Sequence, residues 1–157
     1  MSRLYGRAAP DQRVIDSVPQ LSGTPTTTLA VIGLTGITAP MVWSGAVNGT
    51  VFYSYLEQCV VPTLKAGDVL FMDNLSAHKV QGIETLITSC GAYLIYLPPY
   101  SPDLNPIELA WSKVKTILRR LKSRTFSELI EALKQALLAI TPQDVRGWFA
   151  HCGYAIN

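Results

Sequence analysis

Between residues 50 and 97, segments with helical spacing alternate with short apolar runs, and this alternation limits the chain to few architectures. Apolar residues recur at helical spacing over residues 50–61 and again around residues 80–89. Residues 68–72 and 92–97 are short and nearly all apolar, and the first run is typical of a strand covered on both faces of a parallel sheet. Because the order is helix, strand, helix, strand, we predict parallel pairing and an α/β fold.

The part before residue 50 predicts a β-hairpin. Residues 27–34 and 37–44 are rich in apolar and β-branched side chains, and a Thr-Gly pair separates them. Residues 1–26 mix Arg, Pro, Ser and Gly with scattered apolar residues, which indicates an irregular lead-in. We therefore predict one domain with one continuous core, divided into a lead-in (1–26), a core (27–122) and C-terminal helices (123–157).

Asp73 follows the apolar run 68–72 directly, at the predicted C-terminal end of a strand. Open α/β sheets bind ligands where their strand ends open into a crevice, so Asp73 is a candidate metal ligand. The alternative is a turn, in which the side chains of Asp73 and Asn74 supply hydrogen bonds that end the strand. Position alone favours the turn.

A rigid loop and a sharp helix start precede Glu108. Prolines at positions 98, 99 and 102 exclude a helix over residues 98–103, because each restricts the residue before it as well as itself. Asn105 is then a good N-cap, Pro106 fits the first helical position, and Glu108 lies three residues after the cap. Glu108 either completes a capping box or is a second candidate ligand. A simple cap needs no such loop, which favours the ligand.

Basic side chains concentrate on the helix that begins at Pro106. Six of the thirteen Lys and Arg residues lie between Lys113 and Arg124, where there is no Asp or Glu. The net charge of +2 does not by itself indicate nucleic acid, so this cluster is the electrostatic signal. Its two interpretations are a solvated helix face and a surface that binds phosphates. The candidates for phosphate contacts are Lys113, Lys115, Arg119 and Arg120.

The rest of the composition narrows the class of protein. The three cysteines are widely spaced and form no CxxC pair, so we expect reduced thiols and neither disulfides nor a zinc site. No signal peptide and no apolar run of about 18 residues is present, so we expect a soluble, cytoplasmic protein. Charged residues make up 15% of the chain, against about 25% in typical domains, which predicts that a partner subunit or a further segment covers part of the surface.

Two long segments closely resemble the catalytic blocks of one enzyme family. They are Phe71–Val80, with the sequence FMDNLSAHKV, and Tyr96–Lys115, with the sequence YLPPYSPDLNPIELAWSKVK. They are similar to the second and third catalytic blocks of DDE-type transposases in the mariner-like superfamily, on the branch of bacterial insertion sequences. Asp73 and Glu108 are separated by 34 residues, the spacing of that group. The resemblance extends over essentially the whole chain.

The resemblance implies an RNase H-like fold, in which helices flank a mixed sheet, and a centre where carboxylates hold two Mg²⁺ or Mn²⁺ ions. It implies that Asp73 and Glu108 are the catalytic metal ligands. Asn74 and His78 are auxiliary candidates, although His78 has the alternative of simply beginning the next helix. The implied reaction is phosphodiester hydrolysis and strand transfer at transposon ends. The implied partners are DNA and either further copies of the chain or an upstream transposase segment.

In the family, the first catalytic Asp lies on a strand that would precede Met1. Asp11 and Asp16 match other positions, so we expect that this carboxylate and its central strand are missing. The chain alone would then cleave DNA negligibly and would leave unpaired strand edges. Three interpretations stay open. They are a catalytic segment completed by another reading frame, a non-catalytic regulator that inhibits the full-length enzyme, and a remnant without activity.

Overall fold

The computed structural model describes residues 9–12 and 25–156 of the 157-residue chain. The predicted lead-in is therefore described only at residues 9–12 and 25–26, and Asp16 lies outside the described residues. None of the described helices is long and apolar enough to cross a membrane. Cys59, Cys90 and Cys152 are free thiols.

The predicted hairpin is present. β1 (Thr26–Gly33) and β2 (Gly36–Ser44) pair antiparallel along their length. Gly36 has a φ of +134°, a conformation that glycine adopts without the steric cost of a side chain, so it suits the tight turn. The register shifts between Leu29 and Val31, and an irregularity of this kind bends a strand and increases its twist.

The helix predicted from residue 50 begins as α1 (Gly49–Tyr55) and continues through a π-helical turn, η1 (Leu56–Val60), and a 3₁₀ turn, η2 (Val61–Thr63). The Asn48 side chain accepts a hydrogen bond of 3.0 Å from the Val51 N–H and so caps the helix. The inward side chains are almost completely buried, and they are Phe52, Tyr55, Leu56 and Val60.

Two parallel strands follow, as the alternation predicted. β3 (Val69–Met72) pairs in parallel with β4 (Tyr93–Tyr96). A 3₁₀ turn, η3 (Ser76–His78), and α2 (Ile83–Ser89) connect the two strands. Among the described residues this pair forms its own two-stranded sheet, separate from the hairpin.

The prediction that β3 is covered on both faces is wrong in the described structure. Leu70 and Met72 are buried against α1 and α2, whereas Val69 and Phe71 are 45% and 41% exposed. The residues of β4 alternate in the same way, with Tyr93 more exposed than its neighbours. The apolar sequence fits two covered faces, but the described helices pack on only one.

Three helices make up the C-terminal part. A 3₁₀ turn, η4 (Pro102–Leu104), leads into α3 (Pro106–Leu121), which is followed by α4 (Phe126–Leu138) and α5 (Pro142–His151). The 3₁₀ turn corrects the prediction that residues 98–103 contain no helix. A proline at the first position of a single turn has no N–H to lose, so it is compatible with that turn.

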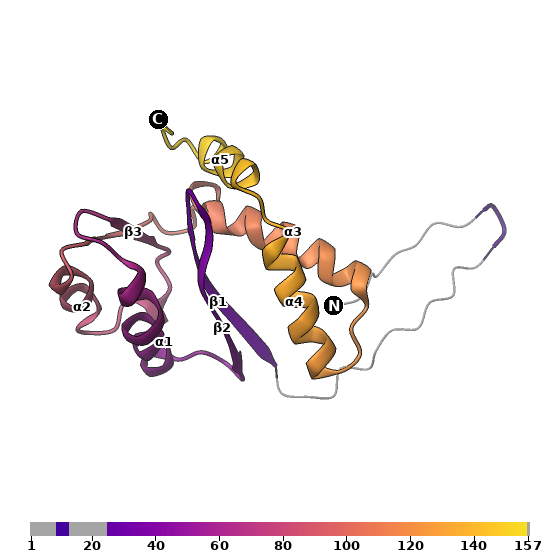
Figure 1. Cartoon of the computed structure of the whole chain (residues 1–157), viewed down its shortest axis with the longest axis horizontal. Helices are drawn as coiled ribbons and strands as arrows, with labels where there is room; N and C mark the ends of the chain where they lie inside the picture. Colours follow the sequence, from indigo (N-terminus) through magenta and orange to yellow (C-terminus); the bar gives the residue numbers. More distant parts are fainter. Residues whose placement is uncertain (1–8, 13–24, 157) are drawn as a thin grey trace.

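The hairpin separates two clusters of buried side chains, where one continuous core was predicted (Figure 1). Leu29 and Val31 of β1 pack against the first core and Ile32 packs against the second, because successive side chains of a strand point to opposite faces. The buried members of the first core are Phe52, Tyr55, Leu56, Val60, Leu70, Met72, Ile83, Ile87 and Ala92. Those of the second are Ala110, Val114, Leu133, Ala136, Ile140 and Val145.

Candidate metal centre

Asp73 and Glu108 line the same cavity, whose volume is about 740 Å³. Three continuous stretches of the chain contribute much of its lining. They are residues 28–35 of β1 and its turn, residues 68–73 of β3 and its ends, and residues 105–108 at the start of α3. We call this cavity the β1–β3 groove. Both carboxylates that the sequence selected are therefore among the residues that line one cavity.

Asp73 directly follows the last residue of β3 and forms the turn contact that the alternative interpretation predicted. Its Oδ1 accepts a hydrogen bond of 3.3 Å from the Leu75 N–H. A carboxylate has about four acceptor positions, and the Asp73 side chain is 38% exposed, so acceptor capacity is left for a cation. The turn and the ligand interpretations are compatible in this geometry.

His78 lies against Asp73. Its Nδ1 is 2.5 Å from Asp73 Oδ1 but is not aligned as a hydrogen bond, so the contact is an ion pair when the imidazole is protonated. The His78 ring stacks on Phe52 with centroids 4.0 Å apart. The Tyr96 hydroxyl donates a hydrogen bond of 2.8 Å to the His78 carbonyl. These contacts hold the imidazole beside the Asp73 carboxylate, and His78 ends a 3₁₀ turn and does not begin α2.

Glu108 lies in the first turn of α3 without forming the capping box that was its structural alternative. The Asn105 side chain makes no capping hydrogen bond. α4 and α5 do begin with capping boxes, so among these three helices only α3 lacks one. Glu108 faces the groove close to the positive end of the helix dipole, which favours a negative charge there.

Asn74, the other auxiliary candidate, has a buried side-chain oxygen. Its Oδ1 has no hydrogen-bond partner in the part of the chain that the structure describes. Leaving a buried acceptor unpaired costs about 1–3 kcal/mol, so an external donor or cation would stabilise it. Because Asn74 is adjacent to Asp73, this oxygen stays a candidate contributor to the centre.

The two carboxylates fit a divalent metal in kind but not in number. Mg²⁺ and Mn²⁺ prefer oxygen ligands, which both side chains provide. Over residues 9–12 and 25–156, however, no group of three His, Cys, Asp or Glu side chains is placed to hold a metal ion.

Comparison with known protein families shows which family this chain belongs to. The sequence profile of the DDE superfamily endonucleases matches residues 1–130, a range that includes both groove carboxylates. The chain belongs to this family. No curated protein sequence matches it.

Solved structures of Mos1 transposase share the fold of this DDE family member. The Mos1 strand transfer complex gives a TM-score of 0.69 at 14% identity, over 99% of this chain and 51% of that chain. The Mos1 mariner paired end complex with Mn gives 0.67 at 14% identity, over 97% and 51%. The catalytic domain of Mos1 mariner transposase gives 0.61 at 13% identity, over 84% and 76%. The predicted RNase H-like fold is confirmed, and the chain spans about half the length of the Mos1 chains in these complexes.

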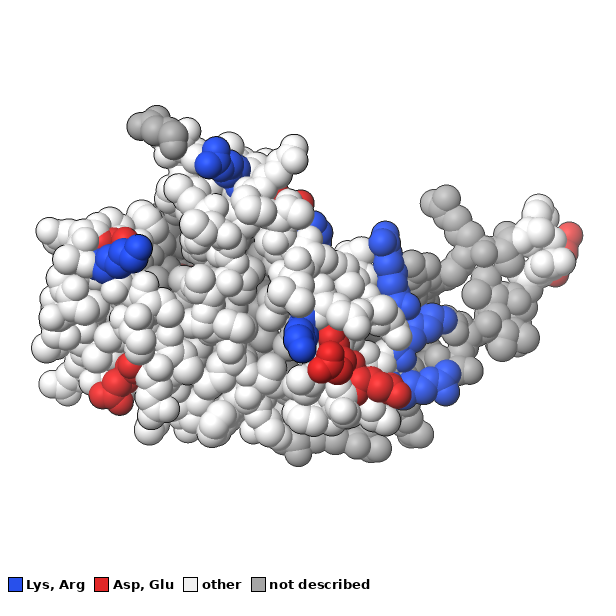
Figure 2. Space-filling view, viewed as in Figure 1, with Lys and Arg blue, Asp and Glu red and all other residues white. Residues whose placement is uncertain are grey.

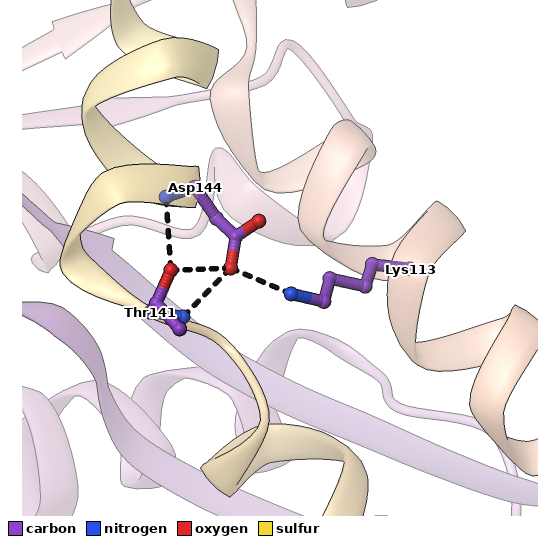
Figure 3. Close-up of polar contacts among 3 residues, drawn as sticks. All are labelled: Lys113, Thr141 and Asp144. Carbon is purple, nitrogen blue, oxygen red and sulfur yellow. Dashed lines mark hydrogen bonds and ion pairs between the residues drawn. The ribbon is translucent and has the colours of Figure 1, made fainter.

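Lys113, one of the four predicted phosphate contacts, makes an ion pair within this DDE family member. Its Nζ donates a hydrogen bond of 2.6 Å to Asp144 Oδ2 (Figure 3). The same oxygen accepts bonds from the Thr141 N–H at 2.8 Å and the Thr141 hydroxyl at 2.7 Å. The Lys113 bond and then the Thr141 bonds lower the pKa of Asp144 to about 2. Lys113 thus ties α3 to the start of α5.

Replacing Lys113 by methionine is expected to lower the free energy of unfolding at neutral pH by up to about 1 kcal/mol, because the pair is partly exposed. The folded pKa of Asp144 is depressed, so the pair stabilises the fold above about pH 4 and loses this effect as pH falls toward 2. Urea unfolding at pH 7 and pH 2.5 measures both values. Lys115→Met is the control, and an equal loss in both variants would contradict the structural role of Lys113.

Lys115, Arg119 and Arg120 are exposed on α3. Figure 2 shows basic side chains gathered near the end of the molecule where α3 ends, with acidic side chains beside them. At about 1.5 Å of rise per residue, Lys115 lies roughly 10 Å and Arg119 roughly 16 Å along the axis from Glu108. These charges are therefore positioned away from the groove, along one helix that begins at it.

Tyr154 contacts the groove from the C-terminal segment, and sequence reasoning did not select it. Its hydroxyl donates a hydrogen bond of 2.9 Å to the Leu104 carbonyl. Its ring meets Phe71 edge-on at 5.4 Å and Phe149 at 5.5 Å between centroids. Burial raises the pKa of Tyr154, which keeps the hydroxyl a neutral donor. A single aromatic residue beyond the last helix has no periodic neighbours, so no sequence pattern pointed to it.

Proposed function

We propose that the chain is the catalytic-domain segment of a DNA transposase, which carries out phosphodiester hydrolysis and strand transfer at transposon ends. The observation that carries the proposal is that Asp73 and Glu108, at the spacing typical of the family, line one groove. Membership of the DDE endonuclease family supports the same reaction class. Such an activity belongs where the DNA is, which for a bacterial insertion sequence is the cytoplasm.

Asp73 and Glu108 would hold Mg²⁺ or Mn²⁺, which when bound would stabilise the charge that develops on phosphate oxygens. Asp73 would be oriented from two sides, by the Leu75 N–H and by the His78 imidazole. Second partners of this kind fix the direction of a ligand and so raise its affinity for the metal. Asn74 is not among the residues that line the groove, but its buried oxygen, next in sequence to Asp73, would be an additional acceptor.

The proposal requires a third carboxylate from outside the described residues, because none of those residues completes a group of three. We therefore expect that the chain alone, with Mg²⁺ and transposon-end DNA, shows no cleavage above background. An upstream transposase segment or a further copy of the chain would supply the missing ligand. Nicking by the purified chain that disappears in Asp73→Ala would contradict this requirement.

Metal binding tests the two proposed ligands without any cleavage assay. We expect weak Mn²⁺ binding, measured from the loss of the free-ion electron paramagnetic resonance signal. Asp73→Ala and Glu108→Ala should each weaken it at least about tenfold, since loss of even an outer partner of a ligand costs 10-fold or more. Glu84→Ala, which removes an exposed carboxylate from the first turn of α2, is the matched control. Equal binding by all four proteins would exclude the proposed site.

The exposed basic residues of α3 are proposed to contact DNA phosphates flanking the reacting one. A position roughly 16 Å from Glu108 corresponds to about five nucleotides of one strand at 3.4 Å each. Replacing Lys115, Arg119 and Arg120 with Gln should weaken binding similarly for all DNA sequences. Each lost contact should reduce the slope of log affinity against log salt by about 0.9.

Fluorescence anisotropy with two unrelated duplexes at several salt concentrations measures this effect. Lys134→Gln on α4 is the matched control, because it removes an exposed charge outside the cluster. Lys113→Gln should change the slope less than the others, since Asp144 already compensates its charge. An unchanged salt slope in the triple variant would show that α3 does not contact phosphates.

The second candidate function is a non-catalytic regulator that binds full-length transposase. The observation that favours it is that the described carboxylates form an incomplete centre beside open strand edges. Adding the purified chain to a transposition reaction separates the two functions. Inhibition that survives Asp73→Ala favours the regulator, and stimulation that is lost in Asp73→Ala favours the catalytic segment.

A further inference from the structure

One tyrosine side chain contacts both segments that carry the proposed metal ligands. The Tyr154 hydroxyl donates its hydrogen bond of 2.9 Å to the Leu104 carbonyl, which lies in the 3₁₀ turn η4, shortly before Glu108. The Tyr154 ring meets Phe71 of β3 edge-on at 5.4 Å between centroids, shortly before Asp73. Tyr154 therefore joins the end of β3 to the start of α3.

Within the described part of the chain, no hydrogen bond or ion pair joins these two segments directly. The polar contacts of residues 69–75 are with their own turn, with His78, and with β4 and its end. Those of residues 101–108 stay within their own loop and helix, apart from the bond that Leu104 accepts from Tyr154. Tyr154 thus supplies the hydrogen bond that ties the segment before Glu108 to another part of the fold.

The direction of the Tyr154 side chain follows from the way α5 ends. Gly153 has a φ of +87°, the left-handed conformation that glycine adopts without the steric cost of a side chain. The Gly153 N–H donates to the Ala150 carbonyl at 3.1 Å, and the Tyr154 N–H donates to the Phe149 carbonyl at 3.0 Å. These two bonds form a Schellman motif, in which the residue after the glycine packs back on the last turn of the helix. The Tyr154 and Phe149 rings make that contact, with their centroids 5.5 Å apart.

The loop and turn that lead into α3 have few bonds of their own. η4 is a single turn, closed by bonds of 3.2 Å from the Leu104 N–H to Ser101 and of 3.1 Å from the Asn105 N–H to Pro102. Just before it, Tyr100 has a φ of +58°, a conformation that residues with a side chain rarely adopt. Such a conformation persists where surrounding contacts determine it. The hydrogen bond from Tyr154 is a contact of this kind.

We propose that Tyr154 is a positioning residue, which holds the start of α3 against β3 and so fixes the Glu108 carboxylate relative to that of Asp73. The consequence for metal affinity rests on the proposed function, in which these two carboxylates are ligands. Ligands that are already held in place bind more tightly, because less ordering is left to occur on binding. The Tyr154 hydroxyl is engaged by the Leu104 carbonyl, so Tyr154 acts through Glu108.

Tyr154→Phe tests the proposal, because it removes the hydroxyl and keeps the ring that contacts Phe71 and Phe149. Loss of one hydrogen bond should raise the population of an opened η4 about threefold to tenfold. We expect amide exchange at Leu104 and Glu108 to accelerate by that factor, because these amides exchange through local opening. The Mn²⁺ affinity of the full chain, measured from the free-ion electron paramagnetic resonance signal, should fall by about threefold or more.

Thr27→Val is the matched control for a loss of general stability. It also removes a hydroxyl that donates to a backbone carbonyl, that of Gly45 at 2.7 Å, and Thr27 is not part of the groove lining. It should lower the urea midpoint of unfolding about as much as Tyr154→Phe does. Its Mn²⁺ affinity and its amide exchange at Leu104 should stay within about twofold of the unsubstituted chain. Equal losses of Mn²⁺ affinity in the two variants would show a merely structural role and overturn the proposal.

Gly153→Ala tests the turn that directs Tyr154. The added methyl group meets no atom within 4 Å, but the left-handed φ becomes strained, so Mn²⁺ binding should weaken as in Tyr154→Phe. Gly147→Ala is its control, since it adds a methyl group in equally open space within α5 at an ordinary φ. Unchanged Mn²⁺ affinity in Gly153→Ala as well as in Gly147→Ala would contradict the role assigned to the turn.

The combined results separate this inference from the proposed function. If Asp73→Ala and Glu108→Ala weaken Mn²⁺ binding but Tyr154→Phe does not, the positioning role is overturned and the metal site stands. If neither carboxylate variant changes Mn²⁺ binding, the metal site and the positioning role both fail. Unchanged amide exchange at Leu104 in Tyr154→Phe would overturn the positioning role without any metal.

Discussion

Replacing Asp73 or Glu108 with alanine is expected to lower DNA cleavage by at least about 1,000-fold once a third carboxylate completes the centre. A metal ion that stabilises developing charge contributes several kcal/mol, and each 1.4 kcal/mol corresponds to tenfold in rate. The measurement uses the chain joined to, or mixed with, an upstream transposase segment, and follows single-turnover nicking of a transposon-end duplex. Folding of each variant is checked by its thermal unfolding temperature.

The control for this experiment is Glu84→Ala, which removes an exposed carboxylate that is not part of the groove lining. It should leave the cleavage rate within about twofold of the unsubstituted protein. His78→Ala should cause an intermediate loss, because His78 lines the groove and contacts Asp73 but supplies no carboxylate. Cleavage that persists at the full rate in either Asp73→Ala or Glu108→Ala would show that the centre lies elsewhere.

The largest expected loss of stability follows from Leu133→Ala in the second core. Leu133 lies on α4, is only 7% exposed, and belongs to the same core as buried residues of α3 and α5. Removing a buried leucine side chain leaves a cavity and costs about 2–5 kcal/mol. A loss in this range is a large fraction of the 5–15 kcal/mol that stabilises a typical domain.

Leu138→Ala is the matched control for that substitution. It removes the same atoms from the last residue of the same helix, where the side chain is 76% exposed. Its effect should stay within about 0.5 kcal/mol. Urea unfolding of both variants gives the comparison, and equal effects would show that α4 packs through a different face.

The strands and helices of this chain could be predicted because local patterns specified them. The hairpin of β1 and β2 is marked by two β-branched runs around a Thr-Gly turn. Both strands begin one residue earlier than predicted, β1 also ends one residue earlier, and β2 ends where it was predicted to end. α4 and α5 begin directly after Thr125 and Thr141, each of which forms a reciprocal capping box. Turn and cap chemistry acts over a few residues, so it can be read without the fold.

Interactions that depend on the arrangement of elements were not predictable in this way. Sequence reasoning allowed a capping box at Glu108, but the Asn105 side chain does not form one, and Glu108 lines the groove instead. It named Lys113 as a candidate for phosphate contacts, and did not predict the ion pair that Lys113 makes with Asp144 of α5. Both outcomes depend on which surface lies opposite the helix, and no local pattern in α3 contains that information.

The exposed face of β3 is a further feature that the sequence did not predict. An apolar run predicts burial on both faces, yet Val69 and Phe71 remain partly exposed in the described structure. The low share of charged residues had predicted that something further covers the surface. An apolar pattern predicts which side chains are buried, but it does not predict which residues pack against them.

A crystal structure of the chain grown with Mn²⁺ tests the central claim most directly, because anomalous scattering locates the metal. We expect an anomalous peak in the β1–β3 groove within bonding distance of a carboxylate oxygen of Asp73 or Glu108, with the two carboxylates close enough to flank ions about 4 Å apart. Carboxylates more than about 8 Å apart, too far for a shared centre of that spacing, with Mn²⁺ at neither of them, would contradict it.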